Sequence, residues 1–201
     1  MASSGNFCVL NRADPAAYQI PSTGNLRIGD TGSSADLAGR GGTFYVKTGK
    51  WYWEIHQRAV PTASYPYVGI SVGSRGSGLD GNRAYNYGPS YYAPAGTLAS
   101  QAAGYTGLGT LTTTSTGVTA ATAGDIINFA LDMDNGAWYI GVNGTYVTGA
   151  DGSVGNPASG SARTGAVRTF APNTRKYIYG TSTQSGFNCV DEVNFGQKSF
   201  T

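Results

Sequence analysis

The sequence predicts an all-β protein built from many short antiparallel strands, in the form of a sandwich or a barrel. Glycine contributes 31 of the 201 residues, roughly twice the average share of about 7%. Among the charged residues, lysine and glutamate, which favour helices, are scarce. Aromatic and β-branched runs alternate with turn residues throughout the chain, a pattern typical of strands.

The length and hydrophobic content predict one domain. A chain of 201 residues with 40% hydrophobic residues can bury one core without a metal or a disulfide scaffold. We expect residues 1–40 to form an N-terminal arm and the first strands, and residues 41–201 the main β-sandwich domain.

Cys8 and Cys189 are the only cysteines. They are predicted to be buried thiols, and whether they pair stays open.

Charge argues against several partner classes. The net charge is +2, charged residues make up 12% of the chain, and the arginines are scattered rather than clustered. A nucleic-acid partner is therefore not expected.

The N-terminus lacks a secretory pattern, and no apolar run reaches the roughly 18 residues of a spanning helix, so we expect synthesis in a cytoplasm and no membrane insertion.

The first strong strand signal is a hairpin around Lys47–Lys50. Residues 43–47 and 51–56 are rich in aromatic and β-branched residues and flank a glycine turn. With a period of two, Trp51, Trp53 and Ile55 share one face, which we predict to be a core face. Residues 52, 54 and 56 share the other.

A tyrosine-rich segment follows the next predicted strand, residues 67–72. Tyrosine offers a large contact area with little loss of entropy and a polar tip. The segment is therefore a candidate partner-binding loop. The alternative, that half of the tyrosines only cover the edge of the sandwich, is weighed equally. The candidate residues are Arg83, Tyr85, Tyr87, Tyr91 and Tyr92.

Residues 125–143 predict a second hairpin. Asn135-Gly136 separates two strand-like runs, and this dipeptide favours a type I′ turn because both residues accept positive φ. Phe129 and Leu131 lie on the predicted core face together with residues 127 and 133. Further strands are expected at residues 166–170, 177–180 and 193–196, the last supplying Phe195 to the core.

Four segments, in order, resemble the SPRY domain family: Gly49–Glu54, Tyr67–Ser71, Gly124–Gly136 and Val193–Gly196. The resemblance implies a bent sandwich of two antiparallel sheets, of the concanavalin-like jelly-roll type, whose members bind proteins through loops at one end and catalyse nothing. The chain looks like stand-alone SPRY-like virion proteins of tailed bacteriophages. It has no RING, B-box or coiled-coil segment, so a ubiquitin-ligase role is not expected.

Catalytic and metal sites are not expected. His56 is the only histidine, and Glu54 on the same strand face supplies no nucleophile. Residues 132–136 resemble the start of a calcium loop, but position twelve would be Asn143, where a bidentate glutamate is required. Asn143-Gly144-Thr145 fits a glycosylation pattern, which we interpret as a turn. The chain is thus predicted to be non-enzymatic and to use no cofactor.

The function expected from the sequence is that of a virion structural protein, assembled in the host cytoplasm. A chain that is nearly all one domain suggests a capsid decoration or cement protein. It would dock, possibly in several copies, on the major capsid protein or another virion component through its sandwich face and an N-terminal arm that carries Phe7, Val9 and Leu10. The alternative is a tail or fibre adhesin that recognises a host glycan or surface protein through the tyrosine-rich loops.

Overall fold

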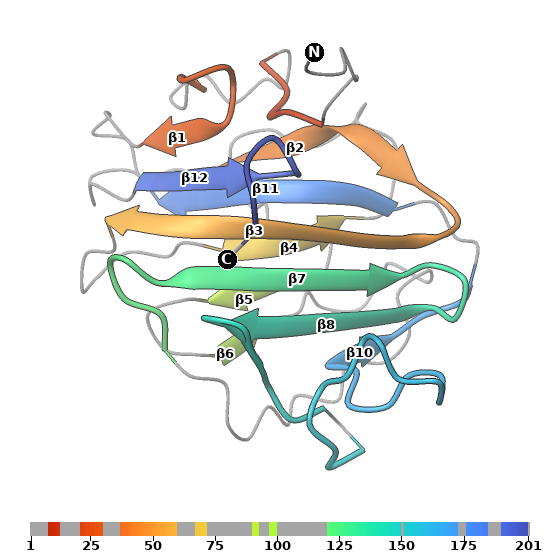
Figure 1. Cartoon of the computed structure of the whole chain (residues 1–201). Helices are drawn as coiled ribbons and strands as arrows, with labels where there is room; N and C mark the ends of the chain where they lie inside the picture. The colour runs from red at the N-terminus through yellow and green to blue at the C-terminus, as the bar shows by residue number, and fades with distance from the viewer. Residues whose placement is uncertain are drawn as a thin grey trace.

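The computed structural model describes two antiparallel sheets packed face to face (Figure 1). It covers residues 8–12, 21–29, 37–59, 67–71, 90–92, 97–99, 120–149, 151–172, 176–184 and 190–200. The predicted β-sandwich is confirmed. Among the described residues there is no helix long and apolar enough to cross a bilayer.

The front sheet in Figure 1 has seven strands and the rear sheet has five. The front sheet runs β1 (Arg27–Gly29), β12 (Val190–Asn194), β3 (Lys50–Ala59), β7 (Ile126–Asp132), β8 (Ala137–Val142) and β10 (Arg168–Thr169), with β9 (Thr145–Tyr146) paired to β8. The rear sheet runs β2 (Leu37–Val46), β11 (Lys176–Gln184), β4 (Tyr67–Ser71), β5 (Ser90–Tyr92) and β6 (Thr97–Ala99).

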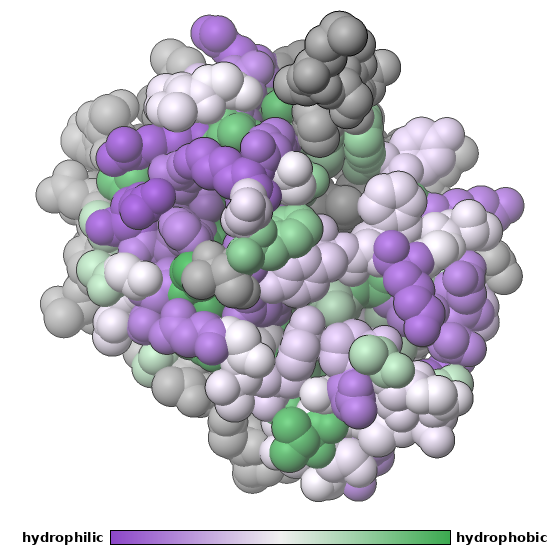
Figure 2. Space-filling view, in the orientation of Figure 1, coloured by the Kyte–Doolittle hydropathy of each residue, from purple (hydrophilic) through white to green (hydrophobic). Residues whose placement is uncertain are grey.

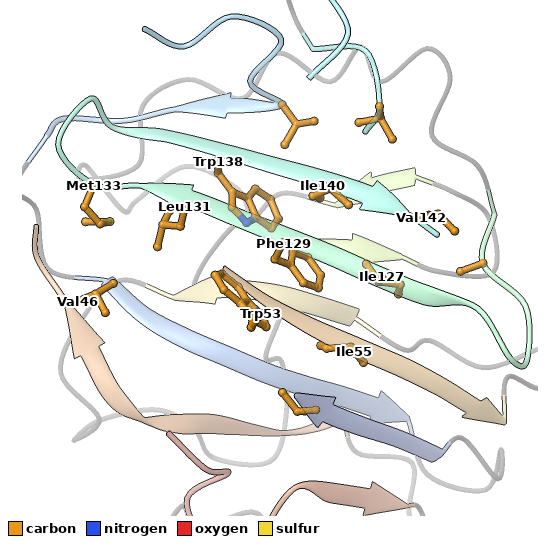
Figure 3. Close-up of a cluster of buried hydrophobic side chains, with 14 of the residues drawn as sticks. Val46, Trp53, Ile55, Ile127, Phe129, Leu131, Met133, Trp138, Ile140 and Val142 are labelled. Atoms are coloured by element: carbon orange, nitrogen blue, oxygen red, sulfur yellow. The ribbon is translucent and has the colours of Figure 1, made fainter. Parts of the chain in front are cut away.

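The core lies between the sheets and is centred on three parallel aromatic rings (Figure 3). The ring of Phe129 stacks on Trp53 at a centroid distance of 5.1 Å and on Trp138 at 5.9 Å. Ile55 and Leu131, also predicted as core residues, are buried. Phe195 is partly buried and packs against this cluster.

Trp51 is a correction to the predicted core face, because its side chain is 39% exposed. Its partner Leu131 in β7 is buried, so the alternation itself is regular. Trp51, however, is the second residue of β3, at the end of the sheet. Its indole N–H turns back to the carbonyl of Thr48, which places the ring beside the β2–β3 turn rather than deep between the sheets.

Both predicted turns are present, but the type I′ geometry belongs to Asn143-Gly144 and not to Asn135-Gly136. Asn143 and Gly144, with φ of 50° and 79°, form a two-residue loop between the paired residues Val142 and Thr145, as a type I′ turn requires. The β7–β8 loop instead has four residues, 133–136. There Gly136 has a positive φ and Asn135 does not.

The described residues 8–12 of the N-terminal arm pack on the sandwich, and the burial of Leu10 corrects its predicted role as a partner contact. Leu10 has an exposed fraction of 0%, and it forms an antiparallel bridge with Gly42 in β2. Its N–H also donates to the carbonyl of Asn25 at 2.8 Å. Val9 is partly exposed, and Phe7 lies outside the described residues.

The arm also meets the segment that follows the last strand. The side-chain amide of Gln197 donates to the carbonyl oxygen of Cys8. Cys8 is buried and is not part of a disulfide, whereas Cys189 lies outside the described residues.

Candidate interaction surface

One end of the sandwich is built from two turns that are hydrogen-bonded to each other. The N–H of Gly49, in the β2–β3 turn, donates to the carboxylate of Asp134 at 2.7 Å. The N–H of Met133, in the β7–β8 turn, donates to the carbonyl of Gly49 at 3.0 Å. Gly49 has a φ of +83°, a conformation that glycine adopts without strain. The two turns therefore hold each other in place.

Trp51 projects from this locked pair of turns. The indole Nε1–H donates to the carbonyl of Thr48 at 2.8 Å, which fixes the orientation of the ring while 39% of the side chain stays exposed. Lys50 pairs with Asp132 at 3.5 Å. Arg163 donates to the carbonyl of Asn135 at 2.7 Å. Hydrophilic side chains gather at this end of the molecule, on the right in Figure 2.

We call this region the Trp51 surface. It consists of an exposed indole and exposed charged side chains on turns that are held by hydrogen bonds, namely Lys47, Lys50, Trp51, Asp134 and Arg163. A rigid aromatic residue surrounded by polar groups is the arrangement that contributes most to binding at protein interfaces, because little entropy is lost on contact.

The outer face of the seven-stranded sheet carries a buried carboxylate. Glu54 has an exposed fraction of 0% although it points away from the core. The hydroxyl of Tyr52 donates to its Oε1 at 2.9 Å, and the amide of Asn194 contacts its Oε2 at 3.5 Å. Asn128 donates to the Tyr52 hydroxyl at 2.8 Å. Tyr52 is thus held in one orientation by groups on β3 and β7.

Burial changes the acid–base behaviour of this face. Desolvation raises the pKa of the Tyr52 phenol well above its ordinary value, and the hydrogen bond to Glu54 raises it further. Tyr52 therefore remains a protonated donor at any physiological pH. Desolvation lowers the pKa of His56, and the nearby Arg58 lowers it further, so the imidazole is neutral at pH 7.

The tyrosine-rich segment is only partly described. Tyr91 and Tyr92 lie in strand β5, paired with Val68 and Tyr67 of β4, which corrects their assignment to a loop. Arg83, Tyr85 and Tyr87 lie outside the described residues, and their predicted role in partner binding stays a prediction.

The residues weighed for chemistry have structural partners. Glu54 is engaged by Tyr52 and Asn194. The carboxylate of Asp132 accepts the N–H groups of Asp134 and Asn135 and so shapes the β7–β8 turn. Within the part of the chain that the structure describes, no group of three or more histidine, cysteine or acidic side chains is placed to hold a metal ion.

The sequence did not reveal the Trp51 surface or the role of the C-terminal residues. The period of two assigned Trp51 to the core. The only sequence signal for its place at the end of the strand was the turn Thr48-Gly49 that precedes it. Phe200, which is 45% exposed and contacts the ring of Tyr52, had no pattern that marked it.

Comparison with solved structures shows which fold this is. The chain is similar to the SPRY domain of human HERC1, with 16% identity, a TM-score of 0.59, and coverage of 94% of this chain and 99% of that one. A second human SPRY domain matches with 11% identity, a TM-score of 0.50, and coverage of 90% and 98%. The chain therefore has the SPRY fold. No family model and no curated protein matches the sequence.

Proposed function

We propose that this chain is a non-enzymatic protein-binding domain that docks through the Trp51 surface. The observation that carries the proposal is the exposed indole of Trp51 on two mutually locked turns. Tryptophan is enriched among the residues that dominate binding energy. The rigid turns also reduce the entropy that a partner must remove when it binds.

The fold supports this proposal. A SPRY sandwich presents its turns at the ends of the two sheets, and the resemblance seen in the sequence implies binding through loops at one end. The β2–β3 and β7–β8 turns, which carry the Trp51 surface, lie at such an end (Figure 1). Leu10 is part of the core, so we do not assign it to the docking surface.

At a finer level, we propose that the partner is a virion component, and that the chain is a capsid decoration protein bound to the major capsid protein of a tailed phage. The support for this assignment is the resemblance to stand-alone phage SPRY-like proteins, in which the motif Gly49–Glu54 follows a glycine-rich segment such as residues 38–43. The low charge content, 12%, supports attachment by apolar and hydrogen-bonding contacts rather than by long-range attraction.

The location of the chain on native particles tests the virion role. The particles are those whose genome encodes the chain, and a cryo-electron microscopy map would be fitted with the sandwich. A decoration protein occupies many symmetry-related positions on the shell. A few copies at the tail would instead indicate an adhesin, and absence from the particle would refute a virion role altogether.

A further inference from the structure

The segment after β12 lies across the outer face of the seven-stranded sheet, in front of β3 in Figure 1. Its first half is firmly attached. Phe195 packs against the core, its N–H donates to the side chain of Gln197 at 2.7 Å, and the Gln197 amide reaches the carbonyl of Cys8. The N–H of Gly196 donates to the side chain of Asn194 at 3.0 Å.

The second half, Lys198–Phe200, is held by weaker contacts. The carbonyl oxygens of Lys198 and Ser199 each accept from the Asn194 amide at 3.3 Å. Lys198 pairs with Glu192, and the lysine side chain is 59% exposed whereas that of the glutamate is 13% exposed. Phe200 makes an edge-to-face contact with Tyr52 at a centroid distance of 4.6 Å and is 45% exposed. The N–H of Lys198 also donates to the side chain of Asn194 at 3.3 Å. All three residues are exposed, whereas Phe195 and Gln197 are partly buried, so the second half is the part of the segment more open to displacement.

The surface under Lys198–Phe200 is built by the sheet and does not depend on this tail. Tyr52 is oriented by its hydrogen bonds with Glu54 and Asn128. Glu192 is oriented by Arg58, whose Nε donates to Oε2 at 3.1 Å. A site whose groups are fixed in advance binds with less entropic cost.

We propose that this surface is a peptide-binding site for a basic-x-aromatic segment of a partner protein, and that the chain's own Lys198-Ser199-Phe200 occupies it until the partner displaces it. This inference rests on the proposed protein-binding function but concerns a different surface. The ligand chemistry follows from the contacts already present: a cation on Glu192, main-chain carbonyls on Asn194 and a ring on Tyr52. When Lys198 leaves, Glu192 loses a cation, which a basic residue of the partner replaces.

A competition experiment tests this proposal with the full-length chain. The probe is the peptide acetyl-Lys-Ser-Phe-amide, and binding is followed by the NMR shifts of the Tyr52 ring. We expect the double variant Lys198→Ala/Phe200→Ala to bind the probe about tenfold more tightly than the unchanged chain, because its own tail no longer competes. Lys198→Ala alone serves the same comparison if the double variant does not fold.

Control probes and variants identify the contacts. Acetyl-Glu-Ser-Phe-amide and acetyl-Lys-Ser-Ala-amide should each bind the double variant at least about fivefold more weakly than the probe, because each lacks one matching group. Adding Glu192→Gln should weaken binding of the probe by a similar factor. Adding Trp51→Ala should leave it unchanged, so a failure of the Trp51 surface and a failure of this site can be distinguished.

Two results would overturn the proposal. One is equal affinity of the probe for the double variant and for the unchanged chain. The other is the absence of any shift of the Tyr52 ring at millimolar probe with a variant whose thermal unfolding shows that it is folded.

Discussion

At the scale of single residues, the two tryptophans at the start of β3 have different roles despite a shared strand face. Trp53 is fully buried and stacks on Phe129, whereas Trp51 is exposed on the β2–β3 turn. Alternation along a strand indicates which face a side chain joins. It does not indicate where the opposing sheet stops covering that face, and this depends on the packing of both sheets.

Substitution by alanine should separate the two roles. We expect Trp53→Ala to lower the free energy of unfolding by about 3 to 5 kcal/mol, because it leaves a cavity in the core. Trp51→Ala should lower it by no more than about 1.5 kcal/mol. Urea unfolding followed by circular dichroism measures both, and equal losses would contradict the assignment of Trp51 to the surface.

His56 makes the free energy of unfolding depend on pH near neutrality. Burial lowers the pKa of its imidazole in the folded state, so the unfolded chain takes up a proton first as the pH falls below the ordinary value of about 6.5. The contribution of His56 to stability is therefore present above that pH and is lost as the pH falls through the folded pKa.

The single histidine makes this dependence easy to measure. The free energy of unfolding should decrease between pH 7 and pH 5 in the unchanged chain, and His56→Gln should reduce that decrease, because glutamine does not titrate. Chemical unfolding at a series of pH values provides the comparison. An identical pH profile for the two chains would show that His56 is not the group responsible.

At the scale of elements, the β7–β8 turn packs closely against the segment that follows β10. An ideal Cβ at Gly136 would lie 2.0 Å from the carbonyl oxygen of Phe170, whereas one at Gly160 has nothing within 4 Å. Gly136 also has a φ of +68°, which other residues adopt only with strain. The β7–β8 turn thus needs glycine for contact with the segment after β10.

A pair of glycine substitutions tests this requirement. Gly136→Ala should destabilise the fold by about 2 to 4 kcal/mol through the clash and the backbone strain. Gly160→Ala is the matched control and should change stability by less than about 0.5 kcal/mol. If differential scanning calorimetry gave the same melting temperature for both variants, the close approach of the β7–β8 turn to the segment after β10 would be contradicted.

Residues 8–12 of the N-terminal arm contribute to the stability of the sandwich. Because Leu10 is completely buried and bridges to β2, Leu10→Ala should lower the free energy of unfolding by about 2 to 5 kcal/mol. Val9→Ala, at a partly exposed neighbour, should have a smaller effect. If the denaturant midpoint of Leu10→Ala were unchanged, Leu10 would not be a core residue, and its predicted role as a partner contact would stand.

At the scale of the whole molecule, the strand patterns predicted a sandwich or a barrel because such patterns are local, and the resemblance to the SPRY family favoured the sandwich. Alternation identified the core faces of β3 and β7, including Ile55, Phe129 and Leu131, all of which are buried. The candidate binding surface was not predictable in the same way. It depends on the meeting of Gly49 and Asp134, which are 85 positions apart, and on the tail that reaches Tyr52 across the sheet.

The central claim is that the chain binds a partner protein through Trp51. Under the proposed virion role, occupancy on the particles whose genome encodes the chain tests this claim most directly. Purified wild type, Trp51→Ala and the matched control Val154→Ala, which alters another exposed hydrophobic side chain, would each be added to particles stripped of the protein. We expect Trp51→Ala to bind about tenfold more weakly or worse, while Val154→Ala binds like wild type and wild-type occupancy survives high salt. Wild-type occupancy by folded Trp51→Ala would contradict the account.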